Sequence, residues 1–269
     1  MVDKYLNTSY YPINKMRLKN FEAGGFRTNL STRIPEPTEI ISGKEGKLYA
    51  NRKDDRSLNF SMVAWDLKER LHLNKNQRIL EVACGAGQLA HHLYKFTKNN
   101  HIFATDGSKE LIKAAKERYN DEPIQFSVQN IHNHFGKGKF DVVVCKDSVH
   151  HFMNLTRGIK ELLNLLKKNG ILYIYDLTRD CLIDQVEARF NTFQDEHEKK
   201  RFLRSLNASL TLKEMVNITE KLGVLEWNFF YPIHFSETNL RHHQEWIKKD
   251  KTQEHKFFRL SRIYVIRKP

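Results

Sequence analysis

From Arg78 onward, short apolar runs alternate with longer runs in which apolar residues recur at helical spacing. The apolar runs are RILEVA (78–83), HIFATD (101–106), IQFSV (124–128), FDVVVCK (140–146) and ILYIYDL (171–177). The runs with helical spacing are GQLAHHLYKF (87–96), SKELIKAAKERY (108–119) and LTRGIKELLNLLKKNG (155–170). This alternation predicts a parallel sheet with helices on both faces, because strands buried on both faces are apolar throughout. We therefore expect an α/β fold whose ligand lies at the carboxyl ends of the strands.

The distribution of loop-forming residues along the chain predicts two domains. Residues 1–73 begin with an irregular segment whose Gly and Pro residues gather mostly at 22–46 and mark loops, and they end in a helix over 57–73; we expect them to cover the substrate. Residues 74–269 form the main domain, with helical insertions at about 180–206 and 233–255.

The elements near the chain's end complete this main domain. A capping box at Thr211 and Glu214 predicts a helix that ends at Gly223. Two later apolar runs, 224–232 and 257–268, predict an antiparallel hairpin at the sheet edge. The helix over 155–170 is expected to end at Gly170, because lysines in the last turn and a following glycine favour a helix terminus.

Composition limits the compartment and the partners. The three cysteines, Cys84, Cys145 and Cys181, are too few and too widely spaced for a disulfide framework or a zinc site, so we expect reduced thiols, a cytoplasmic protein and no metal. No run of about 18 apolar residues is present, so we expect no membrane insertion. The net charge of +13 comes from dispersed residues, which indicates a solvated basic surface or a preference for an anionic acceptor.

The glycine loop CGAGQLA (84–90) fits two kinds of ligand. It resembles a dinucleotide-binding loop, and Asp106 at the end of the second strand suits the ribose of any nucleotide. Glu81, inside the strand before the loop, separates the alternatives. A pyrophosphate would repel this carboxylate, whereas the ammonium and sulfonium groups of S-adenosylmethionine would stabilise it. The remaining chain is also too small and too charged for the substrate domain of a dehydrogenase.

Four ordered motifs resemble the class I S-adenosylmethionine-dependent methyltransferases, most closely the small-molecule group that includes the ubiquinone and menaquinone biosynthesis methyltransferases. The motifs are ILEVACGAGQLA (79–90), ATDGSKELIKAAKER (104–118), FDVVVCKDSVHHF (140–152) and LLKKNGILYIYDL (165–177). The resemblance covers roughly residues 75–230. It implies a Rossmann-like fold with a mostly parallel seven-stranded sheet whose last strand is antiparallel. It also implies S-adenosyl-L-methionine as cofactor and S-adenosyl-L-homocysteine as product.

The resemblance also implies the residues that contact the cofactor. Glu81 would lie near its methionine end, and Asp106 would accept hydrogen bonds from the ribose. Asn130 replaces the aspartate that usually accepts from the adenine amino group. The full set is Glu81, Ala83, Gly85, Gly87, Asp106, Gly107, Asn130, Ile131 and Lys146.

The catalytic candidates follow the fourth strand, in CKDSVHHF. Methyl transfer needs alignment of the acceptor above all, and a general base helps when the acceptor is a hydroxyl or an acidic carbon. His151 is the first candidate and His150 the second, with Asp147 also at the rim. A second histidine pair, His91 and His92, is interpreted as packing or surface.

The sequence thus predicts an enzyme that methylates an oxygen, nitrogen or carbon atom of a small molecule. A methyltransferase acting on RNA or DNA is the first alternative, although a nucleic-acid partner is not favoured because no Asn/Asp-Pro-Pro-Tyr motif follows the fourth strand. A non-catalytic binding protein is the second. A homodimer is allowed by the sequence but not indicated by it.

Overall fold

A computed structural model describes residues 21–23, 25–28, 30–51, 57–132, 139–230, 232 and 260–269. Residues 1–20 and the insertion predicted at 233–255 lie outside the described residues.

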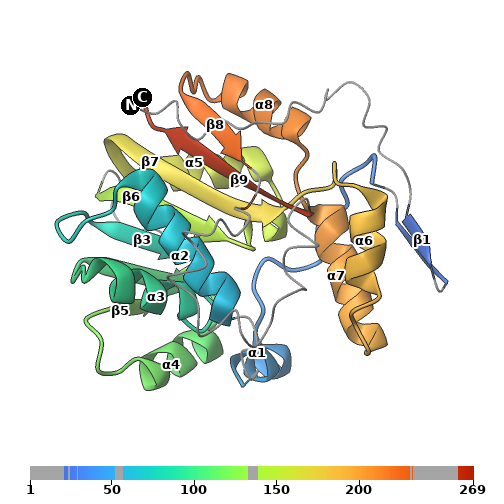
Figure 1. Cartoon of the computed structure of the whole chain (residues 1–269), viewed down its shortest axis with the longest axis horizontal. Coiled ribbons are helices and arrows are strands. Elements are labelled where there is room, and N and C mark those ends of the chain that lie inside the picture. Colours follow the sequence, from blue (N-terminus) through green and yellow to red (C-terminus); the bar gives the residue numbers. More distant parts are fainter. Residues whose placement is uncertain are drawn as a thin grey trace, which may run out of the picture.

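The core of the molecule is a seven-stranded sheet with the order β5-β4-β3-β6-β7-β9-β8 (Figure 1). Its strands are β3 (Ile79–Val82), β4 (Ile102–Asp106), β5 (Gln125–Val128), β6 (Phe140–Lys146), β7 (Leu166–Leu177), β8 (Trp227–Phe230) and β9 (Ser261–Arg267). The first five are parallel neighbours, and β9 runs antiparallel between β7 and β8. This confirms the predicted Rossmann-like sheet and its antiparallel last strand.

Helices cover both faces of this sheet, as predicted. The helices of one face are α2 (Ser57–Leu71), α3 (Gln88–Thr97) and α4 (Lys109–Arg118), and those of the other are α5 (Leu155–Leu165) and α8 (Leu212–Lys221). Their buried leucine, isoleucine and alanine residues pack on strands that are apolar on both sides. The predicted capping box of α8 is present: Thr211 Oγ1 accepts from the Glu214 amide, and the Glu214 carboxylate accepts from the Thr211 amide.

The expected end of α5 at Gly170 is wrong. The helix ends at Leu165, and the next residue already pairs with Phe140 as part of β7. The Lys167 ammonium binds the Asp141 carboxylate at 2.8 Å instead of lying in a last helical turn. Near the expected helix terminus, the residue with a left-handed backbone conformation is Asn169, with φ 61°. Pairing of the buried Leu166 with the neighbouring strand thus outweighs the local signals for a helix terminus.

A smaller lobe lies beside the carboxyl ends of the strands (Figure 1). It contains the hairpin β1 (Phe21–Ala23) and β2 (Phe26–Thr28), the helices α6 (Ile183–Phe190) and α7 (Glu196–Ala208), and a separate apolar cluster. The helix α1 (Gly43–Ala50) packs on α4.

A buried arginine joins this lobe to the sheet domain. Arg179 has 0 % of its side chain exposed. Its Nε donates to the Ser209 carbonyl at 2.8 Å and its Nη1 to the Leu30 carbonyl at 2.9 Å, while its Nη2 pairs with the Glu214 carboxylate. One cation therefore holds the N-terminal segment, the end of α7 and the start of α8 together.

Candidate active site

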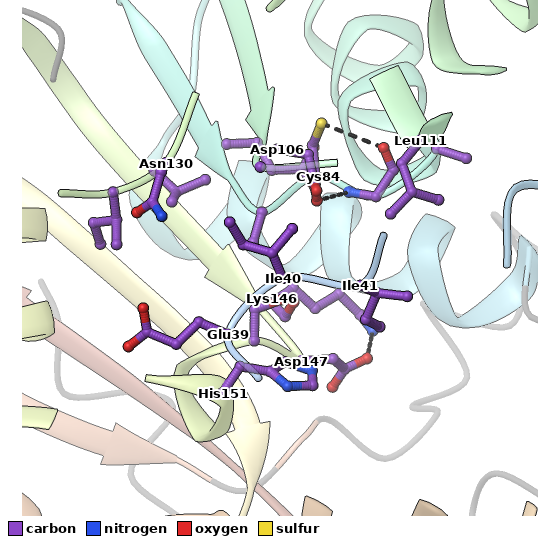
Figure 2. A pocket seen from close by; sticks show the side chains of 18 of the residues that line it. Glu39, Ile40, Ile41, Cys84, Asp106, Leu111, Asn130, Lys146, Asp147 and His151 are labelled. Carbon is purple, nitrogen blue, oxygen red and sulfur yellow. Dashed lines mark hydrogen bonds and ion pairs between the residues drawn. The ribbon is translucent and has the colours of Figure 1, made fainter. Parts of the chain in front are cut away.

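A cavity opens at the carboxyl ends of β3, β4 and β6 (Figure 2). Nine of the predicted site residues line it: Glu81, Ala83, Gly85, Asp106, Gly107, Asn130, Ile131, Lys146 and His151. Two do not, namely Gly87 and His150. The strand order explains the grouping, since the ends of adjacent parallel strands meet at one edge of the sheet.

The loop after β3 is a tight turn whose backbone faces the cavity. Ala83, Gly85 and Gly87 all have positive φ, at 56°, 57° and 85°. The Gly85 amide donates to Asp106 Oδ2 at 3.0 Å, which ties the loop to the end of β4. Asp106 Oδ1 accepts from the Ser108 amide at 2.8 Å, and burial raises the pKa of this carboxyl group. Asp106 therefore both holds the loop and borders the cavity.

Glu81 is a buried carboxyl group on the cavity wall. Its residue is 3 % exposed, and among the described residues its Oε2 has no hydrogen-bond partner. Burial raises its pKa to about 8, which the Ala90 backbone and the Lys146 ammonium offset only in part. The unpartnered Oε2 can accept a hydrogen bond, and the ammonium of an amino-acid ligand would supply both the donor and a positive charge.

Lys146, a predicted cofactor contact, lines the cavity. Its ammonium binds the Asp147 carboxylate (Figure 2) and lies 4.6 Å from the ring centre of Phe60 and 5.0 Å from that of Tyr175. This places a cation among aromatic rings at the end of β6.

The two histidines that follow β6 have different surroundings. His150 is buried, and its Nδ1 lies 2.6 Å from Asp176 Oδ1 while its amide donates to Asp176 Oδ2 at 2.9 Å. Burial alone would lower the pKa of His150, but the charge of Asp176 raises it on balance. His151 lines the cavity, and its Nδ1 lies 3.1 Å from Glu36 Oε2. Of the two histidines, His151 therefore lines the cavity and His150 lies behind it.

Asn130, the adenine acceptor predicted from the sequence, lines the cavity and already accepts one hydrogen bond. Asn130 Oδ1 accepts from the His132 amide at 2.9 Å. The preceding residue, Gln129, also lines the cavity, and its buried Oε1 has no hydrogen-bond partner among the described residues. Gln129 is thus a further cavity residue with a free acceptor atom, and no motif in the sequence indicated it.

The segment over 30–51 closes one side of the cavity. Figure 2 shows Ile40 and Ile41 between Asp106 and His151 in that view, and Tyr49 also lines the cavity. A Cβ on Gly107 would lie 2.8 Å from the Ile40 side chain, so Ile40 packs directly on that glycine. The sequence had suggested a cover from this part of the chain but not which residues form it.

Residues 73–251 match the family model described as "Methyltransferase domain". The chain belongs to this family. It is a class I S-adenosylmethionine-dependent methyltransferase domain, as the motifs implied, and the cofactor of the family is S-adenosylmethionine. None of the helices in the described part of this methyltransferase is both long and apolar enough to span a bilayer.

Two curated relatives illustrate the range of the family. The methyltransferase is 27 % identical over 134 residues to malonyl-[acyl-carrier protein] O-methyltransferase of Bacillus cereus, covering 50 % of this chain and 49 % of the relative. It is 33 % identical over 107 residues to ubiquinone biosynthesis O-methyltransferase of Pelagibacter ubique, covering 39 % and 44 %. The chain thus spans about half the length of the curated relatives it matches.

Solved structures share the fold of this methyltransferase. The plantazolicin methyltransferase BpumL, in complex with a triazolic desmethylPZN analog and SAH, superposes with a TM-score of 0.61 at 20 % identity, covering 82 % of this chain and 89 % of that one. Phospholethanolamine N-methyltransferase 2 of Haemonchus contortus gives 0.52 at 15 % identity, covering 83 % and 60 %.

Gly87 of the methyltransferase has a packing role that a substitution can measure. A Cβ there would lie 2.8 Å from the Phe126 ring, and the φ of 85° adds strain. We expect Gly87→Ala to lower the free energy of unfolding by about 2–4 kcal/mol through these two effects. Gly85→Ala is the matched control, because Gly85 also has a positive φ but nothing lies within 4 Å of its Cβ position. Urea unfolding of both variants tests this, and equal losses would show that the Phe126 contact costs nothing.

Proposed function

We propose that this protein transfers a methyl group from S-adenosylmethionine to a small-molecule acceptor whose reacting atom lies beside His151. The observation that carries the proposal is that one cavity is lined by Glu81, Asp106 and His151. Among the described residues, Oε2 of this glutamate has no hydrogen-bond partner. The acceptor atom is an oxygen or nitrogen, because a titratable side chain at that end suits an atom that loses a proton. The net charge of +13 favours an anionic acceptor.

The residues of the cavity fit the cofactor by their chemistry. Glu81 would bind the ammonium group, Asp106 the ribose hydroxyls, and Gln129 the adenine amino group, with Asn130 and Ile131 beside it. The loop at Ala83 and Gly85, with Gly107, would let the cofactor approach the backbone closely. When bound, the cofactor supplies a methyl group activated by a positively charged sulfur.

The protein's own contribution is to orient the acceptor and exclude water. His151 would contact the acceptor, and Ile40, Ile41 and Phe60 would close the cavity over both ligands. His150 would not contact the acceptor directly, because it lies outside the cavity and is bound to Asp176.

The relatives' names favour a small or carrier-bound acceptor over the nucleic-acid alternative. All three cysteines are buried and form no disulfide within the described residues, which supports a cytoplasmic location. The homodimer and the lid role of residues 1–73 remain predictions.

Replacing Asp106 with alanine tests the proposed cofactor site. We expect micromolar binding of S-adenosylmethionine and S-adenosylhomocysteine to the wild type, and at least tenfold weaker binding to Asp106→Ala, because hydrogen bonds to a charged group contribute about 1.5–3 kcal/mol each. Calorimetric titration measures both, with NAD as the competing ligand.

Asp121→Ala, at an exposed turn residue, is the control and should bind like the wild type. Binding of NAD alone, or unchanged binding of the adenosyl ligands by Asp106→Ala, would contradict the proposal.

A further inference from the structure

Three side chains from distant parts of the chain bring together nitrogen and oxygen atoms that can bind a metal ion. They lie beside the part of the cavity lined by His151, where we place the acceptor. Glu36 comes from the N-terminal segment, and His150 and His151 come from the 3-10 helix η3 (Val149–His151). One ligand atom from each lies within 4.8 Å of the others. Glu36 Oε2 is 3.1 Å from His151 Nδ1, and Glu36 Oε1 is 4.0 Å from His150 Nε2. These separations suit atoms that share one cation.

A second layer of residues orients two of these ligands. Asp176 lies 2.6 Å from His150 Nδ1, so the proton of a neutral His150 belongs on Nδ1 and the lone pair on Nε2. That lone pair is on the side of Glu36. Ser205 Oγ, from α7, donates to Glu36 Oε1 at 2.7 Å. A carboxylate behind a ligating histidine is the usual support of metal-binding imidazoles, because it sets the tautomer and the ring orientation.

The third candidate ligand, His151, has a ring nitrogen without a hydrogen-bond partner among the described residues. His151 Nδ1 is buried and, although it is 3.1 Å from Glu36 Oε2, it makes no hydrogen bond of acceptable geometry with the described residues. A cation between the two atoms would satisfy both the imidazole nitrogen and the carboxylate oxygen.

The surrounding charge also permits a cation. Glu36 contributes one carboxylate, which accepts from Ser205 and lies beside both imidazoles. Asp176 adds a second carboxylate behind His150. The opposing charge is Arg33, whose guanidinium donates to the carbonyls of His150 and Phe152. With neutral imidazoles, these three charged groups sum to one negative charge.

We propose that Glu36, His150 and His151 bind a divalent transition-metal ion of the Zn²⁺ class, with Asp176 as the positioning residue. Two imidazoles and one carboxylate are the ligand set of catalytic zinc sites, which keep a further position open, whereas Mg²⁺ and Ca²⁺ prefer oxygen ligands. Because His151 lines the cavity, the open position would face the acceptor. The part of this inference that concerns the reaction rests on the proposed function: the ion would hold an oxygen atom of the acceptor.

Titration of chelator-treated full-length protein with Zn²⁺ tests the site, and the visible absorption of bound Co²⁺ reports its ligands. We expect one ion per chain, an affinity loss of at least 100-fold in Glu36→Gln and in His151→Phe, and a loss of 10- to 100-fold in Asp176→Asn. Glu36→Gln keeps an oxygen that can accept from Ser205, so this variant should remain folded, which circular dichroism checks.

His91→Phe is the matched control. His91 Nδ1 also lies near a carboxylate, 2.8 Å from Glu122 Oε1, but away from the cavity. Equal Zn²⁺ affinity in the wild type and Glu36→Gln would overturn the site, as would an equal loss in His91→Phe. Titration of the same samples with S-adenosylhomocysteine keeps the two proposals apart, because Glu36→Gln should bind it normally whether or not the metal site exists. Methyl transfer that is unchanged by chelation would overturn the role assigned to the ion and leave His151 as a proton acceptor.

Discussion

Replacing Glu81 with glutamine is expected to weaken binding of S-adenosylmethionine and S-adenosylhomocysteine by roughly 30- to 150-fold. Removing one partner of a buried charge pair costs about 2–3 kcal/mol or more, because the other charge is left without compensation. Both ligands carry the ammonium that we place against Glu81, so both should lose affinity. Calorimetry measures the change, with Glu117→Gln as a control at an exposed glutamate on α4.

Binding to Glu81 should also release a proton. The pKa of Glu81 is about 8 without ligand, so the carboxyl group is mostly protonated at pH 7, and an adjacent ammonium would favour its ionised form. Titrations at pH 7 in buffers of different ionisation enthalpy should show close to one proton released by the wild type and none by Glu81→Gln. Release that is equal in the two proteins would place the ammonium elsewhere.

The same group makes the ligand-free protein less stable at alkaline pH. Its pKa is raised from 4.5 to about 8 on folding, so between these values the folded state binds more protons than the unfolded state. The stabilisation is therefore complete below pH 4.5 and is lost as pH rises from there through 8, by about 5 kcal/mol in all. We expect urea unfolding of Glu81→Gln to lack this part of the pH dependence, and identical pH profiles would contradict the burial of a neutral Glu81.

The second large effect is expected at Arg179. Arg179→Met should lower the free energy of unfolding by about 3–5 kcal/mol, because it leaves two buried carbonyls and the Glu214 carboxylate without their donor. For a protein of this size that corresponds to a melting temperature lower by about 10 °C. Thermal and urea unfolding followed by circular dichroism measure it.

Arg267→Met provides the comparison for Arg179. Arg267 pairs with Glu226 at 2.9 Å, but both side chains are largely exposed, so this loss should stay below about 1 kcal/mol. Similar losses in the two variants would mean that burial of Arg179 contributes little to the junction between the lobe and the sheet.

The sheet, and the gathering of residues from several strand ends around one cavity, could be predicted because their signals are local. Five apolar runs and one glycine loop lie in the order that a parallel sheet requires, and residues at strand ends necessarily meet. Thr211 and Glu214 likewise predict the start of α8 from four residues of sequence.

The approach of Glu36 to His150 and His151 could not be predicted, because it is a contact between distant segments. Glu36 lies in a stretch with neither helical nor strand periodicity, so no pattern relates it to His151. The end of α5 was wrong for a related reason. Leu166 continues the apolar pattern of the helix, and only its pairing with Phe140 shows that the chain has become a strand.

The position of β9 has a consequence for how the chain folds. Its seven residues complete the sheet between β7 and β8, yet β9 follows every other described strand of the sheet in chain order. Until residues 261–267 emerge, one edge of β7 exposes unpaired backbone groups that can pair with other chains. The strands that surround the cofactor cavity are all encoded earlier, so a nascent chain can form that cavity first. Cofactor present during synthesis could then stabilise the early half of the sheet while the late strand is still missing.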